Sequence, residues 1–167
     1  SNPQNKKKSG ASTLILQRMK YFHSIIFTHS DLETKLTFLL HALKSKALQS
    51  SLHGTEESQL CQKWLDELST TFLQHLEQTQ SNNTSETNRT ETLIEQTTDE
   101  EEEDEDTKKD FSMDVIINCY LSVLRGYVRA SRVPHPNNNS CLEALAVLRK
   151  MQKVLSIQEE NNYATML

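Results

Sequence analysis

The stretch "TEESQLCQKWLDELSTTFLQHL", residues 55–76, decides the fold class of this chain. Its large apolar side chains recur every three or four residues, which is the repeat of one face of an α-helix. Thr55 is placed to cap this helix, and Glu56 and Glu57 suit the positive end of its dipole. The predicted buried face comprises Leu60, Cys61, Trp64, Leu65, Leu68, Phe72 and Leu76. A face of this length predicts a helix packed against other helices.

Two more helices are predicted before this stretch. Ser30 and Glu33 form a capping box for the second of them, because the hydroxyl can accept an orphan N–H while the carboxylate reaches back. Gly54 can end that helix in the left-handed conformation. The predicted core face over residues 13–28 comprises Leu16, Met19, Phe22 and Ile26. The predicted core face of the second helix comprises Leu32, Leu36, Leu39, Leu40, Leu43 and Leu48.

Two further helices are predicted in the last third of the chain. Ser112 is an N-cap residue for the first, whose length and spacing favour a helix over a strand despite its β-branched side chains. Its apolar residues are Val115, Ile116, Cys119, Tyr120, Val123, Leu124, Tyr127 and Val128. Pro134 and Pro136 interrupt the chain, and Ser140 and Glu143 form a second capping box. The last helix is expected to bury Leu142, Leu145, Leu148, Met151 and Leu155.

Residues 79–110 are polar, of low complexity and rich in carboxylates, which is typical of disorder. Eleven acidic residues and Arg89 give residues 86–106 a charge of −10, so the rest of the chain sums to +5 within the net −5. We therefore predict an all-α bundle of about five amphipathic helices, interrupted by a long disordered acidic loop. The predicted segments are a disordered tail (1–11), one helical domain (12–157) with ordered parts 12–78 and 111–157 around the insert 79–110, and a second tail (158–167).

The unbroken acidic run 99–106 has three interpretations. It can be a solvated, self-repelling spacer, a binding segment for basic proteins such as histones, or a segment that folds back onto basic side chains of the bundle. Thr97 and Thr98 directly precede it and are candidate sites for an acidophilic kinase, where phosphorylation would deepen the negative charge.

The sequence contains no pattern typical of a catalytic or metal site. No carboxylate pair lies on an apolar face, no glycine-rich loop precedes a helix, and the six histidines lack metal-ligand spacing. We therefore expect neither cofactor nor metal. Cys61, Cys119 and Cys141 are few and odd in number, which favours reduced thiols and an intracellular, preferentially nuclear, location. No apolar run is long enough to span a membrane.

Basic residues recur at helical spacing near the end of the chain. Arg125, Arg129 and Arg132 follow one another at i, i+4 and i+7. A second group comprises Arg149, Lys150 and Lys153. Each group can be the ordinary solvated face of an amphipathic helix. Each can also be a docking surface for an acidic peptide or a nucleic-acid backbone.

Two local resemblances add alternatives. "SCLEALAVLRKMQ", Ser140–Gln152, resembles a helix of the integrase-binding domain of the lens-epithelium-derived growth factor family. That resemblance implies a small helical bundle that captures disordered motifs of transcription regulators, and it assigns no site residues. Arg129 and His135 are similar to the Arg-x(4–6)-His pattern of HEPN-type helical ribonucleases. That resemblance implies that the two side chains hold and protonate an RNA phosphate.

The favoured hypothesis is a non-catalytic helical protein–protein interaction module of a larger intracellular, nuclear scaffold or regulatory protein. Its expected partners are proteins, including acidic or disordered peptide segments, with a basic protein on the acidic loop as a further option; nucleic acid is a weaker option and no membrane is expected. The alternatives are the integrase-binding-domain-like bundle, an acidic chaperone-like or nucleic-acid-associated module, and the helical ribonuclease.

Overall fold

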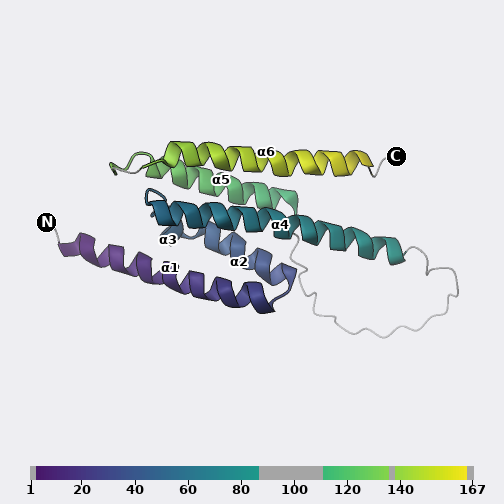
Figure 1. Ribbon diagram of the computed structural model, residues 1–167, viewed down its shortest axis with the longest axis horizontal. Helices are drawn as coiled ribbons and strands as arrows, with labels where there is room; N and C mark the ends of the chain where they lie inside the picture. Colours follow the sequence, from purple (N-terminus) through teal and green to yellow (C-terminus); the bar gives the residue numbers. More distant parts are fainter. Residues whose placement is uncertain (1–2, 87–110, 136–137, 165–167) are drawn as a thin grey trace, which may run out of the picture.

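The computed structural model describes residues 3–86, 111–135 and 138–164, with side chains described over 10–79, 111–135 and 138–156. Over these residues the chain forms six helices and no strand, so the predicted all-α bundle is confirmed. The helices are α1 (Pro3–His29), α2 (Leu32–Lys44), α3 (Lys46–Gln49), α4 (Thr55–Glu86), α5 (Met113–Ala130) and α6 (Ser140–Ala164) (Figure 1). The acidic run 99–106 lies outside the described residues.

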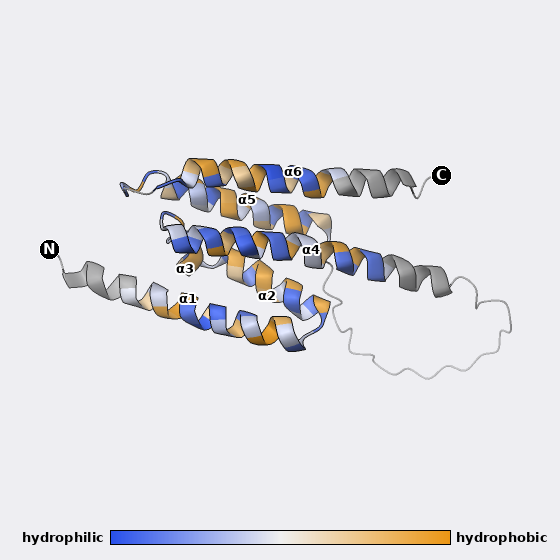
Figure 2. Ribbon diagram, viewed as in Figure 1, coloured by the Kyte–Doolittle hydropathy of each residue, from blue (hydrophilic) through white to orange (hydrophobic). Residues whose placement is uncertain are grey.

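The helices form a bundle in which α4 and α5 occupy the middle. α2 packs against both α4 and α5, and the short α3 also reaches α5. α1 packs on α2 and α3, whereas α6 packs on α5 and α4. Figure 1 shows α1 and α6 at opposite edges of the bundle. Figure 2 shows that both of these edge helices nevertheless carry apolar turns.

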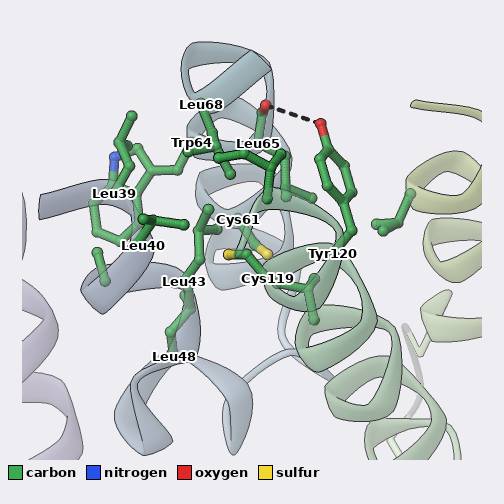
Figure 3. Packing of buried hydrophobic residues seen from close by; sticks show 14 of the residues in the cluster. Leu39, Leu40, Leu43, Leu48, Cys61, Trp64, Leu65, Leu68, Cys119 and Tyr120 are labelled. Atoms are coloured by element: carbon green, nitrogen blue, oxygen red, sulfur yellow. Dashed lines mark hydrogen bonds between the residues drawn. The ribbon is translucent and has the colours of Figure 1, made fainter. Parts of the chain in front are cut away.

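The core follows the stripe that decides the fold class. Trp64, Leu65 and Leu68 of α4 are each at most 1% exposed, and Cys61 and Phe72 extend the same buried face. Figure 3 shows this face meeting leucines of α2 on one side and residues of α5 on the other. The other large, fully buried side chains are Leu36, Leu39, Leu43, Leu48, Leu52, Ile116, Tyr120 and Tyr127. The predicted face of α4 is confirmed, with Leu60 and Leu76 partly buried at its margins.

The second predicted helix is broken in two by Ser45. Its side chain accepts the backbone N–H of Leu48 at 3.3 Å and so caps α3, while its own N–H closes the end of α2. Gln49 then donates to the Leu43 carbonyl at 3.2 Å and to Ser122 of α5 at 3.1 Å. The Leu43 carbonyl, which lacks an intrahelical partner at the end of α2, therefore has a hydrogen-bond donor, and this lowers the energetic cost of the break.

The predicted helix starts are corrected at three positions. Asp31, not Ser30, caps α2 by accepting the Thr34 N–H at 3.1 Å. Hydrogen bonding from the Thr34 side chain, followed by that from its backbone N–H, lowers the pKa of Asp31. Thr55 and Ser140 are first residues of their helices rather than caps. Before α6, Asn138 accepts both the N–H and the hydroxyl of Ser140. The predicted N-cap Ser112 is confirmed in position, although its side chain makes no capping hydrogen bond.

Three helices are longer than their apolar stripes. α1 begins at Pro3, inside the predicted tail 1–11; α4 runs to Glu86, inside the predicted insert; and α6 runs to Ala164, inside the second predicted tail. The apolar pattern predicts helix ends only where large apolar side chains stop. A helix propagates at little cost once nucleated, so polar residues can extend it beyond its packed part.

The predicted faces of α1 and α5 are each wrong at one residue. Phe22 is 53% exposed, and His23 takes its place on the buried face of α1. Val128 of α5 is 51% exposed. The other predicted apolar residues of α5 are buried or partly buried.

The predicted face of α6 is mostly wrong. Leu142, Leu145 and Leu148 are 69%, 49% and 40% exposed. Of the predicted face, Met151 is partly buried against the core and Leu155 is intermediate in exposure. The face that packs on the bundle comprises Ala144, Val147, Met151 and Val154, of which Val147 and Val154 are 0% and 4% exposed. These four residues follow steps of three, four and three, which fit the 3.6-residue repeat better than the leucine series does.

Candidate docking surface

The outer side of α5 carries a shallow hollow of about 350 Å³. Three of its lining residues are apolar and three are the arginines that recur near helical spacing in the sequence. The lining comprises Leu121, Leu124, Arg125, Val128, Arg129 and Arg132. We call Arg125, Arg129 and Arg132 the arginine row, and the whole lining the α5 hollow.

Two buried tyrosines fix the rotation of α5 and so aim the arginine row outward. The Tyr127 hydroxyl lies 3.0 Å from Ser58 Oγ and 3.5 Å from Gln62 Nε2 of α4. Two helical turns earlier, the Tyr120 hydroxyl lies 2.5 Å from Ser69 Oγ of α4. It also lies 3.4 Å from the Leu65 carbonyl oxygen (Figure 3). Burial raises the pKa of Tyr120 to about 12 and raises that of Tyr127 as well.

Arg132 lies beyond the end of α5, yet it stays in the row. Its backbone N–H donates to the Arg129 carbonyl at 3.2 Å, which continues the turn past Ala130. The Asn138 side chain holds this turn by donating to the carbonyl oxygens of Ala130 at 2.8 Å and Val133 at 2.7 Å. Arg125 and Arg129 therefore lie on α5 as predicted, whereas Arg132 lies in the turn after the helix, which Asn138 stabilises.

The charges of the arginine row are not neutralised by the part of the chain that the structure describes. Arg125, Arg129 and Arg132 form no ion pair with any carboxylate of residues 10–79, 111–135 and 138–156. Arg125 and Arg129 are exposed on α5, and Arg132 is exposed after it. The hollow therefore presents three positive charges around an apolar floor.

The second predicted basic group does not join this surface. Lys150 turns toward α4, where its ammonium lies 2.8 Å from Asp66 Oδ1 and donates to the Gln62 carbonyl at 3.2 Å. It therefore ties α6 to α4. Arg149 and Lys153 are exposed on α6 and line no part of the α5 hollow.

The outward position of some apolar residues differs from the sequence-based prediction. Val128 of α5 and Leu142, Leu145 and Leu148 of α6 are expected in the core, but all four are 40–69% exposed. Leu124 packs against the core as expected and also lines the α5 hollow, whereas the α6 leucines are not part of its lining. Two apolar stripes on one helix are the signal that one of them faces outward.

The remaining chemically active groups are His135 and the three cysteines. His135 lies edge-on against His53 of the α3–α4 connection, with ring centroids 5.5 Å apart. Cys61 and Cys119 are free and fully buried, and burial raises the pKa of each thiol to about 12, whereas Cys141 is free and exposed. No group of three metal-binding side chains gathers within the described ranges. Thr97 and Thr98 lie outside those ranges.

No protein-family model matches this chain, and neither a curated protein nor a solved structure shows significant similarity to it. Among the described residues, no helix combines the length and the apolar character needed to cross a membrane.

Proposed function

We propose that the chain is a non-catalytic interaction module, and that the α5 hollow binds an acidic amphipathic segment of a protein partner. The observation that carries this proposal is the arginine row, whose three cations surround an apolar floor without a described counter-charge. Arginine is enriched at protein interfaces because its planar fork binds carboxylates through two parallel hydrogen bonds.

The floor supplies the second half of the interaction. Leu121, Leu124 and Val128 offer apolar area that a purely ionic surface lacks, and burying it contributes roughly 25 cal/mol per Å² before ordering costs. A segment that alternates leucine-like and acidic side chains at helical spacing matches both halves at once. A nucleic-acid backbone would match the charges but not the floor, so a protein partner fits better.

The proposal extends to location and regulation. Three free cysteines, two of them buried, support an intracellular and preferentially nuclear scaffold or regulatory protein. Thr97 and Thr98, ahead of the acidic run, are proposed as phosphorylation sites. Phosphate there would add negative charge to a segment that is already strongly acidic.

The test is a binding titration with a synthetic acidic amphipathic helical peptide, followed by fluorescence anisotropy. Arg125→Glu/Arg129→Glu should weaken binding by about tenfold or more, most strongly at low salt, because exposed charges are least screened there. The matched control is Lys44→Glu/Lys46→Glu, which makes the same charge change at exposed sites off α5.

Equal weakening in both double variants would refute a specific surface and leave only net charge. Metal-independent RNA cleavage by the unmodified chain, lost in His135→Ala, would replace the proposal with the ribonuclease hypothesis. Circular dichroism of each variant establishes that the bundle is intact before either outcome is read.

A further inference from the structure

α1 has a buried face whose orientation is fixed by a histidine. His23 is 13% exposed, and its Nε2 lies 2.6 Å from Glu67 Oε2 of α4. Its ring stacks on Phe27 at 4.3 Å and on Trp64 at 5.7 Å between centroids. Leu16 is buried on the same side. The rotation of α1 about its axis is therefore set, and the opposite side of the helix faces away from the bundle.

That opposite side is also apolar. Its large side chains are 41–65% exposed: Leu14, Ile15, Tyr21, Phe22 and Ile25. The rings of Tyr21 and Phe22 meet edge-on at 5.9 Å, so these two neighbours form one compact apolar knob. We call these five residues together with Arg18 the outer face of α1. Soluble proteins rarely leave such a contiguous apolar stripe without a partner.

The spacing within the outer face is that of a helix–helix seam. Leu14, Arg18, Tyr21 and Ile25 follow one another at i, i+4, i+7 and i+11, which are the positions that meet a partner helix in a coiled coil. Ile15 and Phe22 flank the seam on one side. The pattern covers nearly two heptads, long enough to dock a helix of a partner.

The charge of α1 identifies what that helix must carry. α1 contains five lysines and arginines and no aspartate or glutamate: Lys6, Lys7, Lys8, Arg18 and Lys20. Arg18 is exposed in the middle of the seam, and no carboxylate of the described residues pairs with it. A helix packed over the seam would bury this cation, and a buried charge is costly unless an opposite charge meets it.

We infer that the outer face of α1 is a second docking surface, which binds an amphipathic helix of a partner protein carrying a glutamate or aspartate opposite Arg18. A polar residue at one seam position would also fix the register of the pair. This surface lies at the edge of the bundle opposite α6 (Figure 1), so it is separate from the α5 hollow and does not depend on the proposal made for it.

Two other occupants fit the outer face less well. A second copy of α1 would bring five more positive charges and no carboxylate for Arg18, so like charges would oppose the pair. An anionic lipid surface would attract the lysines, but helices that lie in a membrane interface keep charges on the polar face. Arg18, in the middle of the apolar face, would be pushed toward the hydrocarbon.

The experiment uses the full chain and two synthetic helical peptides with leucine seams. One peptide carries a single glutamate in its seam and the other carries a lysine at the same place. The wild-type chain should bind the glutamate peptide better than the lysine peptide. Arg18→Glu should weaken binding of the glutamate peptide by about tenfold or more and should invert the preference. Gln17→Glu is the matched control, because this exposed neighbour lies outside the seam, and it should leave binding within about twofold.

Further outcomes decide between occupants and between surfaces. The glutamate peptide should still bind Arg125→Glu/Arg129→Glu, which alters the α5 hollow alone. Equal binding of both peptides, or equal loss in Arg18→Glu and Gln17→Glu, would overturn the inference. Sedimentation of the wild type as a dimer that Tyr21→Ala dissociates would assign the face to a second copy instead. Binding to phosphatidylserine vesicles that Tyr21→Ala abolishes, without peptide binding, would assign it to lipid.

Discussion

Two double variants of α6 test which of its faces holds the bundle together. In Leu142→Ala/Leu145→Ala the larger side chains are truncated, but they are 69% and 49% exposed. In Val147→Ala/Val154→Ala the smaller side chains are truncated, and they are 0% and 4% exposed. Side-chain size alone predicts that the leucine pair costs more stability. The structure predicts the reverse order.

The expected magnitudes follow from burial. A leucine contributes about 2 kcal/mol when fully buried, so the buried third of Leu142 and half of Leu145 together correspond to about 1.6 kcal/mol. Each valine loses two buried methyl groups at about 0.8 kcal/mol apiece and leaves a cavity, while the gain in helix propensity returns about 0.5 kcal/mol. The valine pair should therefore cost about 3 kcal/mol or more.

The assay is urea denaturation followed by circular dichroism, with the free energy of unfolding extrapolated to water. A leucine pair that costs about 4–10 kcal/mol, the sum for two buried leucines, together with a nearly neutral valine pair would refute the orientation of α6. That result would place the leucines in the core and the valines at the surface of α6.

Three further predictions concern the core and the insert. Trp64→Ala should cost about 3–5 kcal/mol, because the indole is 1% exposed among His23 and other core rings, and a loss under about 1 kcal/mol would contradict that burial. The free energy of unfolding should fall as pH rises from 9 toward about 12. The pKa of the Cys61 and Cys119 thiols is 9.0 in the unfolded chain but about 12 in the folded protein, so the unfolded state binds fewer protons in this range. Chemical denaturation that shows no change in stability over this pH range would contradict the prediction. Replacing residues 88–109 by a short glycine–serine linker should preserve a cooperative melt, since the core residues all lie elsewhere, and calorimetry that shows no transition would disprove this.

Sequence periodicity predicted most of the fold, and it failed where two stripes compete on one helix. On α4 the large apolar residues fall on one face, so pattern and packing agree. On α1 the series Leu16, Met19, Phe22 takes two steps of three, which drifts off a 3.6-residue repeat. The buried series continues from Met19 to His23, whose ring packs on Trp64. Because histidine is polar, a search for apolar residues at helical spacing does not include it.

Only the charged half of the candidate surface could be predicted from the sequence. The arginine row is recognisable in the sequence as charges at helical spacing. Because Tyr127 is buried on one side of α5, the arginines must lie on the opposite, exposed side. The apolar floor was not recognisable, because Val128 is indistinguishable from a core residue in sequence alone. Lys150 shows the opposite error: its spacing matched Arg149 and Lys153, yet only the approach of α6 to α4 reveals its pairing with Asp66.

The division of the core across the chain has a consequence for synthesis. Cys61 and Leu65 of α4 lie beside Cys119 and Tyr120 of α5 in the core (Figure 3), and α5 follows α4 only after the segment 87–110. At about 5–20 residues per second, a ribosome needs seconds to deliver α5 after α4 has emerged. During that interval the apolar surface of the first four helices that later packs on α5 is exposed and can associate non-specifically with other proteins. We expect chaperone contacts to concentrate in this window and to end when Tyr120 and Tyr127 reach their α4 hydroxyl partners.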